Sequence, residues 1–149
     1  MVITKAAEED LQAILALQYL AYQSEAKLFS SSDIPPLKQT LQELRSEYEK
    51  GTILKVVHED DKIVGSVRAY CDNDTVYIGK LIVHPDWQRK GIGTKLLLEI
   101  EHRYPNKRYE LFTSTRSKGN IQLYERLGYK SFQEKNMNDE LRFVYLEKK

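Results

Sequence analysis

The segment HPDWQRKGIGTK, from His84 to Lys95, places Gln, Arg and Lys directly before two glycines and then continues into apolar residues. We expect a strand to end at Val83 or His84 and a helix to begin near Gly91. The first N–H groups of a helix have no partner inside the helix, and the helix dipole adds partial positive charge there. Gly91 and Gly93 lack Cβ atoms, so a bulky anion can approach the main chain closely. The pattern therefore predicts an anion site suited to linked phosphate groups.

Two other glycine motifs are excluded by spacing. A dinucleotide fingerprint requires a third glycine where the chain has Leu96. A P-loop requires Gly-Lys-Ser/Thr with another glycine five positions earlier, whereas Gly93 is followed by Thr94 and Lys95 with no such glycine before it. The structural alternative is that the two glycines only form a tight start to the helix and that the polar residues before them are a solvated turn.

The elements that must position this turn follow from the periodicity of the apolar residues. Apolar spacing and glycine or proline stops predict helices from Glu8, from Leu37 to Gly51, from Ile92 to Tyr104 and from Asn120 to Gly128. β-branched and alternating segments predict strands over residues 2–6, 52–60, 61–70, 75–84, 108–114 and 141–148. The predicted order is β, α, α, β, β, β, α, β, α, β, β, in which one further strand lies between the Asn120 helix and the strand at 141–148. Only the strands on either side of the Ile92 helix need a crossover, so this α+β fold has a mostly antiparallel sheet with one parallel pair.

Length and composition narrow the classes of function. The 149 residues suit one domain over residues 1–149, and 23 basic against 22 acidic side chains give no electrostatic case for a nucleic acid or a membrane surface as partner. The single Cys71 excludes an internal disulfide, and His58 and His102 have no second ligand at metal-binding spacing, so we expect no metal. No segment approaches the roughly 20 apolar residues of a membrane span. The chain also begins without the pattern of a secretion signal, so we expect a cytoplasmic protein.

Two segments resemble the GNAT superfamily of N-acetyltransferases. The run from Leu81 to Gly93 is similar to the signature segment of that family, whose pattern [RQ]-x-x-G-x-[GA] after a strand is matched by Gln88, Gly91 and Gly93. Downstream, SKGNIQLYERLGYKSF resembles the family helix that carries a tyrosine followed four residues later by glycine and an aromatic residue, here Tyr124 and Gly128. The order of elements also agrees with the family over nearly the whole chain.

The resemblance implies helices on both faces of the sheet and acetyl-CoA as cosubstrate. Backbone groups at the end of the strand would pair with the pantetheine arm, and main-chain N–H groups of the turn would hold the diphosphate. The implied cofactor-binding residues are Leu81, Ile82, Val83, Gln88, Arg89, Lys90, Gly91, Ile92, Gly93, Thr94, Ser117 and Asn120. Many relatives carry Asn seven residues before the tyrosine, a position that is Ser117 here, while Asn120 follows three residues later. Both are therefore candidates for the polar contact to the cofactor arm, with Asn120 preferred.

Tyr124 is the predicted catalytic residue. A phenol with a pKa of about 10 can protonate a departing thiolate whose conjugate acid has a pKa of about 8.5, because the proton moves only modestly uphill. A backbone N–H of the signature strand would stabilise the oxyanion. The alternative is an ordinary core aromatic, since Ile121, Tyr124 and Gly128 share one face of the helix.

A general base is not visible in the sequence. The strand that would border the substrate, residues 75–84, contains no carboxylate and offers only Tyr77 and Lys80. The base is then Glu25, a water relay, or unnecessary if the amine arrives neutral.

The acceptor is an unidentified primary amine of a small molecule or peptide. The end of the first helix, with Tyr22, Glu25 and Phe29, lies where the family places its variable acceptor wall, and Tyr77 completes the predicted substrate-binding set. A weakly catalytic acyl-CoA-binding sensor of the same fold is the alternative to an enzyme. A homodimer through a sheet edge or the last strands also stays open.

Overall fold

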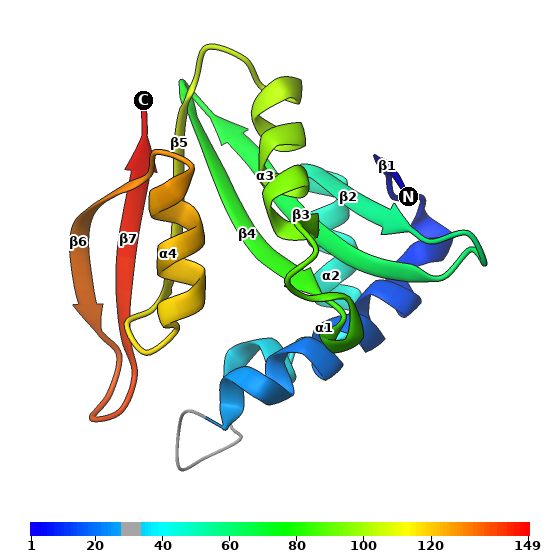
Figure 1. Ribbon diagram of the computed structural model, residues 1–149, viewed down its shortest axis with the longest axis horizontal. Coiled ribbons are helices and arrows are strands. Elements are labelled where there is room, and N and C mark those ends of the chain that lie inside the picture. The colour runs from blue at the N-terminus through cyan, green and yellow to red at the C-terminus, as the bar shows by residue number, and fades with distance from the viewer. Residues whose placement is uncertain (28–33) are drawn as a thin grey trace.

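The computed structural model describes residues 1–27 and 34–149 and contains a seven-stranded mixed sheet with helices on both faces (Figure 1). The strand order across the sheet is β1-β2-β3-β4-β5-β7-β6. The strands are β1 (Val2–Lys5), β2 (Thr52–Val57), β3 (Ile63–Asp72), β4 (Thr75–Val83), β5 (Arg108–Ser114), β6 (Lys130–Asn136) and β7 (Arg142–Lys148). Every neighbouring pair is antiparallel except β4 and β5, which are parallel. The α+β class and the single parallel pair expected from the sequence are confirmed.

The four α-helices are α1 (Leu11–Ala26), α2 (Leu41–Lys50), α3 (Ile92–Arg103) and α4 (Lys118–Arg126). The sequence placed the start of the second helix too early, at Leu37, because that residue lies in a separate 3-10 turn, Pro35–Leu37. The helix begins at Leu41 because Thr40 forms a capping box: its hydroxyl accepts from the Glu43 N–H at 3.1 Å, and the Glu43 carboxylate accepts from the Thr40 N–H at 2.9 Å.

Two apolar clusters hold the helices to the sheet. The larger one contains side chains from β2 to β5, from β7 and from α3 and α4, and the smaller one joins α1 and α2 to β2. Neighbouring residues of β2 show the division, because Ile53 belongs to the smaller cluster and Leu54 to the larger one. This alternation is the period-two pattern of a strand buried on both faces.

A β-bulge interrupts β4 at a position that the sequence did not reveal. Arg68 of β3 is opposite Gly79 of β4, and Ser66 is opposite Ile82, so Val67 alone faces the two residues Lys80 and Leu81. Lys80 has φ 51°, in the left-handed region that side chains rarely adopt. Bulges redirect side chains and often lie beside active sites. The extra residue shifts by one position the alternation with which the side chains of β4 point to the two faces of the sheet.

Candidate active site

The central feature of the molecule is a gap between the two parallel strands. β4 pairs with β5 only from Thr75 to Tyr77, opposite Arg108 to Glu110. Beyond this point the strands diverge, as Figure 1 shows, and β4 has no described strand partner on that side as far as Val83. A cavity of about 950 Å³ lies at this divergence and is lined by residues of β3, β4, β5, β7, α1, α2 and α4.

The glycine turn forms the start of α3, as the sequence predicted. Gly91 is the N-cap with φ 81°, so its conformation favours glycine, and the helix has neither a side-chain cap nor an acidic residue in its first turn. The first helical hydrogen bond after the cap runs from the Lys95 N–H to the Gly91 carbonyl at 3.1 Å. The preceding N–H groups therefore present the positive end of the helix dipole. Arg89 also has positive φ, 64°, and its side chain is exposed, as are those of Gln88 and Lys90.

Close packing places this helix start beside the divergence of β4 and β5. A Cβ at Gly93 would lie 3.4 Å from Leu123 of α4 and 3.7 Å from Leu81 of β4. The N-terminus of α3 is thus wedged between the end of β4 and α4, so the anion site predicted from the sequence and the cavity occupy neighbouring parts of one face.

The structure brings some of the predicted residues together in the cavity and leaves others outside its lining. Those that line it are Tyr22, Tyr77, Leu81, Asn120 and Tyr124. Those outside the lining are Ile82, Val83, Ser117 and the turn from Gln88 to Thr94. Phe29 and the side chain of Glu25 lie outside the described part of the structure.

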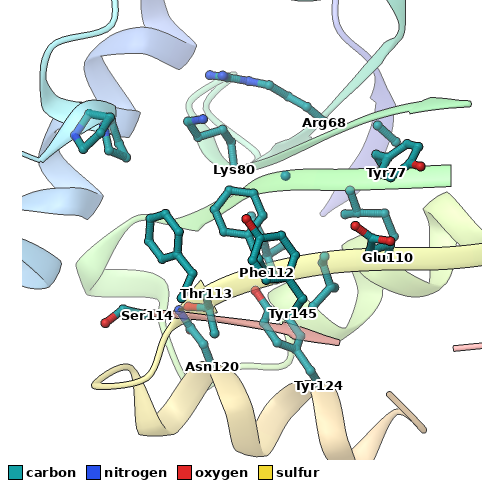
Figure 2. Close-up of a pocket in the computed structure, with 18 of the residues that line it drawn as sticks. Arg68, Tyr77, Lys80, Glu110, Phe112, Thr113, Ser114, Asn120, Tyr124 and Tyr145 are labelled. Atoms are coloured by element: carbon teal, nitrogen blue, oxygen red, sulfur yellow. Dashed lines mark hydrogen bonds between the residues drawn. The ribbon is translucent and has the colours of Figure 1, made fainter. Parts of the chain in front are cut away.

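Tyr124 and Asn120 rise from α4 on one side of the cavity (Figure 2). Tyr124 is 5% exposed and belongs to the larger apolar cluster, so it is both a core aromatic and a cavity wall. The Asn120 amide donates to the Thr113 hydroxyl at 3.4 Å. Ser117 is buried at the N-cap of α4 and lies outside the lining.

The lining of the cavity also carries charged residues that the sequence analysis did not assign to the site. They are Glu47 and Lys50 of α2, Arg68 of β3, Lys80 of β4 and Glu110 of β5. Only Lys80 had been noticed, as a residue of the bordering strand. The others lie on three elements that are distant in sequence, so no spacing signal could have grouped them.

Arg68 is 6% exposed and is held by three side chains. Its Nη1 donates to Glu47 Oε2 at 2.7 Å and to Gln39 Oε1 at 3.0 Å, and its Nη2 donates to Gln18 Oε1. Burial lowers the pKa of Arg68, and Glu47 opposes that shift. Glu110 is likewise paired, since its Oε1 accepts from Arg108 Nη1 at 2.9 Å. Within residues 1–27 and 34–149 no group of three His, Cys, Asp or Glu side chains is placed to hold a metal ion, and no helix could span a bilayer.

The sequence profile of the acetyltransferase (GNAT) domain matches residues 19–149. The chain belongs to the GNAT family. This membership confirms the family and the acyltransferase class (EC 2.3.1.-) expected from the two sequence segments.

Known structures show the same GNAT fold at low sequence identity. The PaiA N-acetyltransferase of Thermoplasma acidophilum, crystallised with coenzyme A, has a TM-score of 0.83 and 20% identity, with 99% of this chain and 98% of that chain covered. The ribosomal-protein-S18-alanine N-acetyltransferase of Escherichia coli has a TM-score of 0.81 and 17% identity, with 99% and 92% covered.

A curated relative, the UPF0157 protein YqkA of Bacillus subtilis (strain 168), is 28% identical over 117 residues, or 78% of this chain. The chain spans 33% of the length of that relative.

Proposed function

We propose that this GNAT chain transfers an acetyl group from acetyl-CoA to a primary amine of a small molecule or peptide. The proposal rests on the divergence of β4 and β5, which opens a large cavity between Tyr124 and the bulged strand β4. This cavity lies beside the N-terminus of α3, which has no side-chain cap.

The residues present fit coenzyme A. From Ile78 to Val83, β4 lacks a described strand partner on its β5 side, so its backbone can pair with the amide groups of a pantetheine arm. The N–H groups from Arg89 to Thr94 surround the positive end of α3 and would hold the diphosphate. The exposed side chains of Arg89 and Lys90 would add charge. A structural relative crystallised with coenzyme A has the same fold over 99% of this chain.

The cosubstrate supplies an acetyl group activated as a thioester. The chain's own residues would then do two things. Backbone N–H groups at the open edge of β4 would donate to the developing oxyanion, in a cavity where water is partly excluded. From its position on α4, Tyr124 would act as the general acid, and its Oη would donate a proton to the departing sulfur.

A ligand-binding experiment tests this function directly. Thermal unfolding is measured with acetyl-CoA, ATP and NAD, because a ligand at 100 times its dissociation constant stabilises the folded state by about 2.7 kcal/mol. We expect a shift with acetyl-CoA alone and, in a second assay, release of free thiol when primary amines are added. The absence of any shift with acetyl-CoA would refute the proposal, and binding without thiol release for any amine would indicate the sensor alternative.

A further inference from the structure

Among the residues that the structure describes, Lys80 is the half-buried cation of the cavity lining that has no hydrogen-bond or ion-pair partner. No hydrogen bond or ion pair involves it in the described part of the chain, although Lys80 is half-buried and lines the cavity. Its backbone adopts φ 51° in the bulge of β4, a conformation that costs roughly 1–2 kcal/mol for a residue other than glycine. Strained conformations of this kind persist mainly where they serve a function.

Among the described residues, the carboxylate that acts electrostatically on Lys80 is that of Glu47, and it is already occupied by other donors. Glu47 Oε2 accepts from Arg68 Nη1 at 2.7 Å and from Gln39 Nε2 at 2.8 Å. The charges of Glu47 and Arg68 cancel, which leaves the charge of Lys80 in excess at this end of the cavity. Lys50 also lines the cavity but is exposed to solvent, so water screens its charge.

The second carboxylate in the lining, Glu110, is also occupied. It is paired with Arg108, and Figure 2 shows it beside Tyr77, at the end of the cavity away from the Lys80 ammonium. In the same view the nitrogen atoms of Lys80 and Arg68 point toward a common end of the cavity. A ligand that enters from the open side of the sheet therefore meets Tyr124 on one wall and, on the other, the Lys80 ammonium, which has no hydrogen-bond or ion-pair partner within residues 1–27 and 34–149.

We propose that the acceptor amine of this enzyme also bears a carboxylate, which forms an ion pair with the Lys80 ammonium. This inference rests on the proposed function and narrows its substrate class to amino acids, or to peptides whose C-terminal carboxylate reaches the cavity. A single negative charge matches the single positive charge of the Lys80 ammonium. A dianion such as a phosphonate would also face the Glu47 carboxylate, which makes it the poorer fit.

The surroundings of Lys80 suit such a ligand. Burial lowers the pKa of Lys80, Glu47 acts to raise it, and Arg68 lowers it further. A bound carboxylate would stabilise the charged ammonium and reverse part of this shift. Phe112, Phe143 and Tyr145 also line the cavity, and their rings pack together, with centroids of Phe112 and Phe143 4.9 Å apart. They provide an apolar wall for the rest of the acceptor.

The test compares acceptors in matched pairs. Short peptides and amino acids are assayed as free carboxylates and as C-terminal amides, with acetyl-CoA saturating, in the wild type, Lys80→Met and Lys80→Arg. Each result is the ratio of kcat/KM for the carboxylate to that for the amide. Comparing this ratio between proteins cancels the different basicity of the paired amines.

We expect the wild-type ratio to fall about 10- to 100-fold in Lys80→Met, the range for loss of a hydrogen bond to a charged group, mainly through KM of the carboxylate. Lys80→Arg should keep most of the preference, because it retains the charge. An unchanged ratio in Lys80→Met would overturn the inference. So would an equal fall in kcat for both members of a pair, since that result indicates a base rather than a binding group, or a preference for aminophosphonates over amino acids.

Coenzyme A binding by calorimetry on the same samples separates this inference from the proposed function. A wild type that binds coenzyme A but acetylates only acceptors without a carboxylate, such as a polyamine, overturns the inference and leaves the proposed function intact. The same conclusion follows if it acetylates none of the carboxylate acceptors. A wild type that does not bind coenzyme A refutes the proposed function itself.

Discussion

The turn that leads into α3 and the wall of the cavity around Lys80 are both regions suited to anions, but they are built in opposite ways. The turn, Gln88 to Thr94, uses consecutive main-chain N–H groups, and its polar side chains are exposed. The Lys80 wall uses side chains from α1, α2, β3 and β4, and its central arginine is buried.

This difference determines how each region should respond to substitution. A backbone site depends on conformation, so it tolerates loss of an exposed side chain and is sensitive to a change at a glycine with positive φ. A side-chain site depends on individual charged groups, so removal of one group changes specificity while the backbone stays the same.

We expect the largest effect on activity from substitution of Tyr124, the proposed general acid. Tyr124→Phe removes one hydroxyl and preserves the ring that packs in the core, so kcat should fall about 100-fold or more, the usual contribution of a positioned acid. Steady-state kinetics with acetyl-CoA and an amine measure this change. Tyr145→Phe is the control, because Tyr145 lines the same cavity from β7. Equal activities of the two variants would show that Tyr124 is only a core aromatic.

The glycine turn should be sensitive to backbone change. Gly91→Ala forces a side chain into a residue with φ 81°, at a cost of roughly 1–2 kcal/mol, although a Cβ there would meet no atom within 4 Å. Both the free energy of unfolding and coenzyme A affinity should fall, as urea titration and calorimetry would measure.

Gly119→Ala is the matched control for the turn. It also has open space around a Cβ but lies within α4 without a positive φ, so it should raise stability by roughly 0.5–1 kcal/mol. If Gly91→Ala behaves like Gly119→Ala, the conformation of the turn is not what the site requires.

The Lys80 wall should show an effect of pH on stability. Lys80→Met removes a half-buried ammonium that has no hydrogen-bond or ion-pair partner in the described part of the chain, so at pH 7 the free energy of unfolding should rise by about 1 kcal/mol, a typical size for a point substitution. Because the folded-state pKa of Lys80 is lowered, the wild type gains stability as pH rises from that pKa to the usual lysine value, where the unfolded chain binds more protons. The advantage of the variant should therefore shrink in urea titrations between pH 7 and 10. A gain that does not depend on pH would show that packing, and not charge, causes it.

The smallest effect should come from the exposed cations of the turn. Arg89→Ala removes a side chain that reaches solvent, so coenzyme A affinity should weaken only a few-fold, and less at high salt, where surface charges are screened. Calorimetry at two salt concentrations measures this. A loss larger than that of Gly91→Ala would reverse the contrast between backbone and side-chain sites.

Much of the fold could be predicted because its signals are local. Alternation in β2 to β4 and the glycine turn before α3 fixed the order of elements and the crossover that makes β4 and β5 parallel. The start of α2 was misplaced because proline and leucine at 35–37 continued a helical spacing that the capping box at Thr40 overrides. Some of the site residues that the sequence proposed, Tyr22, Tyr77, Leu81, Asn120 and Tyr124, do line the cavity. The Arg68 and Glu47 pair could not be foreseen, since its partners are joined only by packing of α2 on the sheet.

The sequence alone determined the glycine turn at the start of α3, because a glycine with a required conformation and a helix start are encoded by adjacent residues. Only the tertiary structure decided the chemistry of the acceptor side. There a one-residue bulge lies at Lys80, which lines the cavity, and the Glu47 carboxylate is occupied by Arg68, a partner that is distant in sequence. Whether a charge is paired depends on which groups surround it in space, and the order of residues along the chain does not specify that.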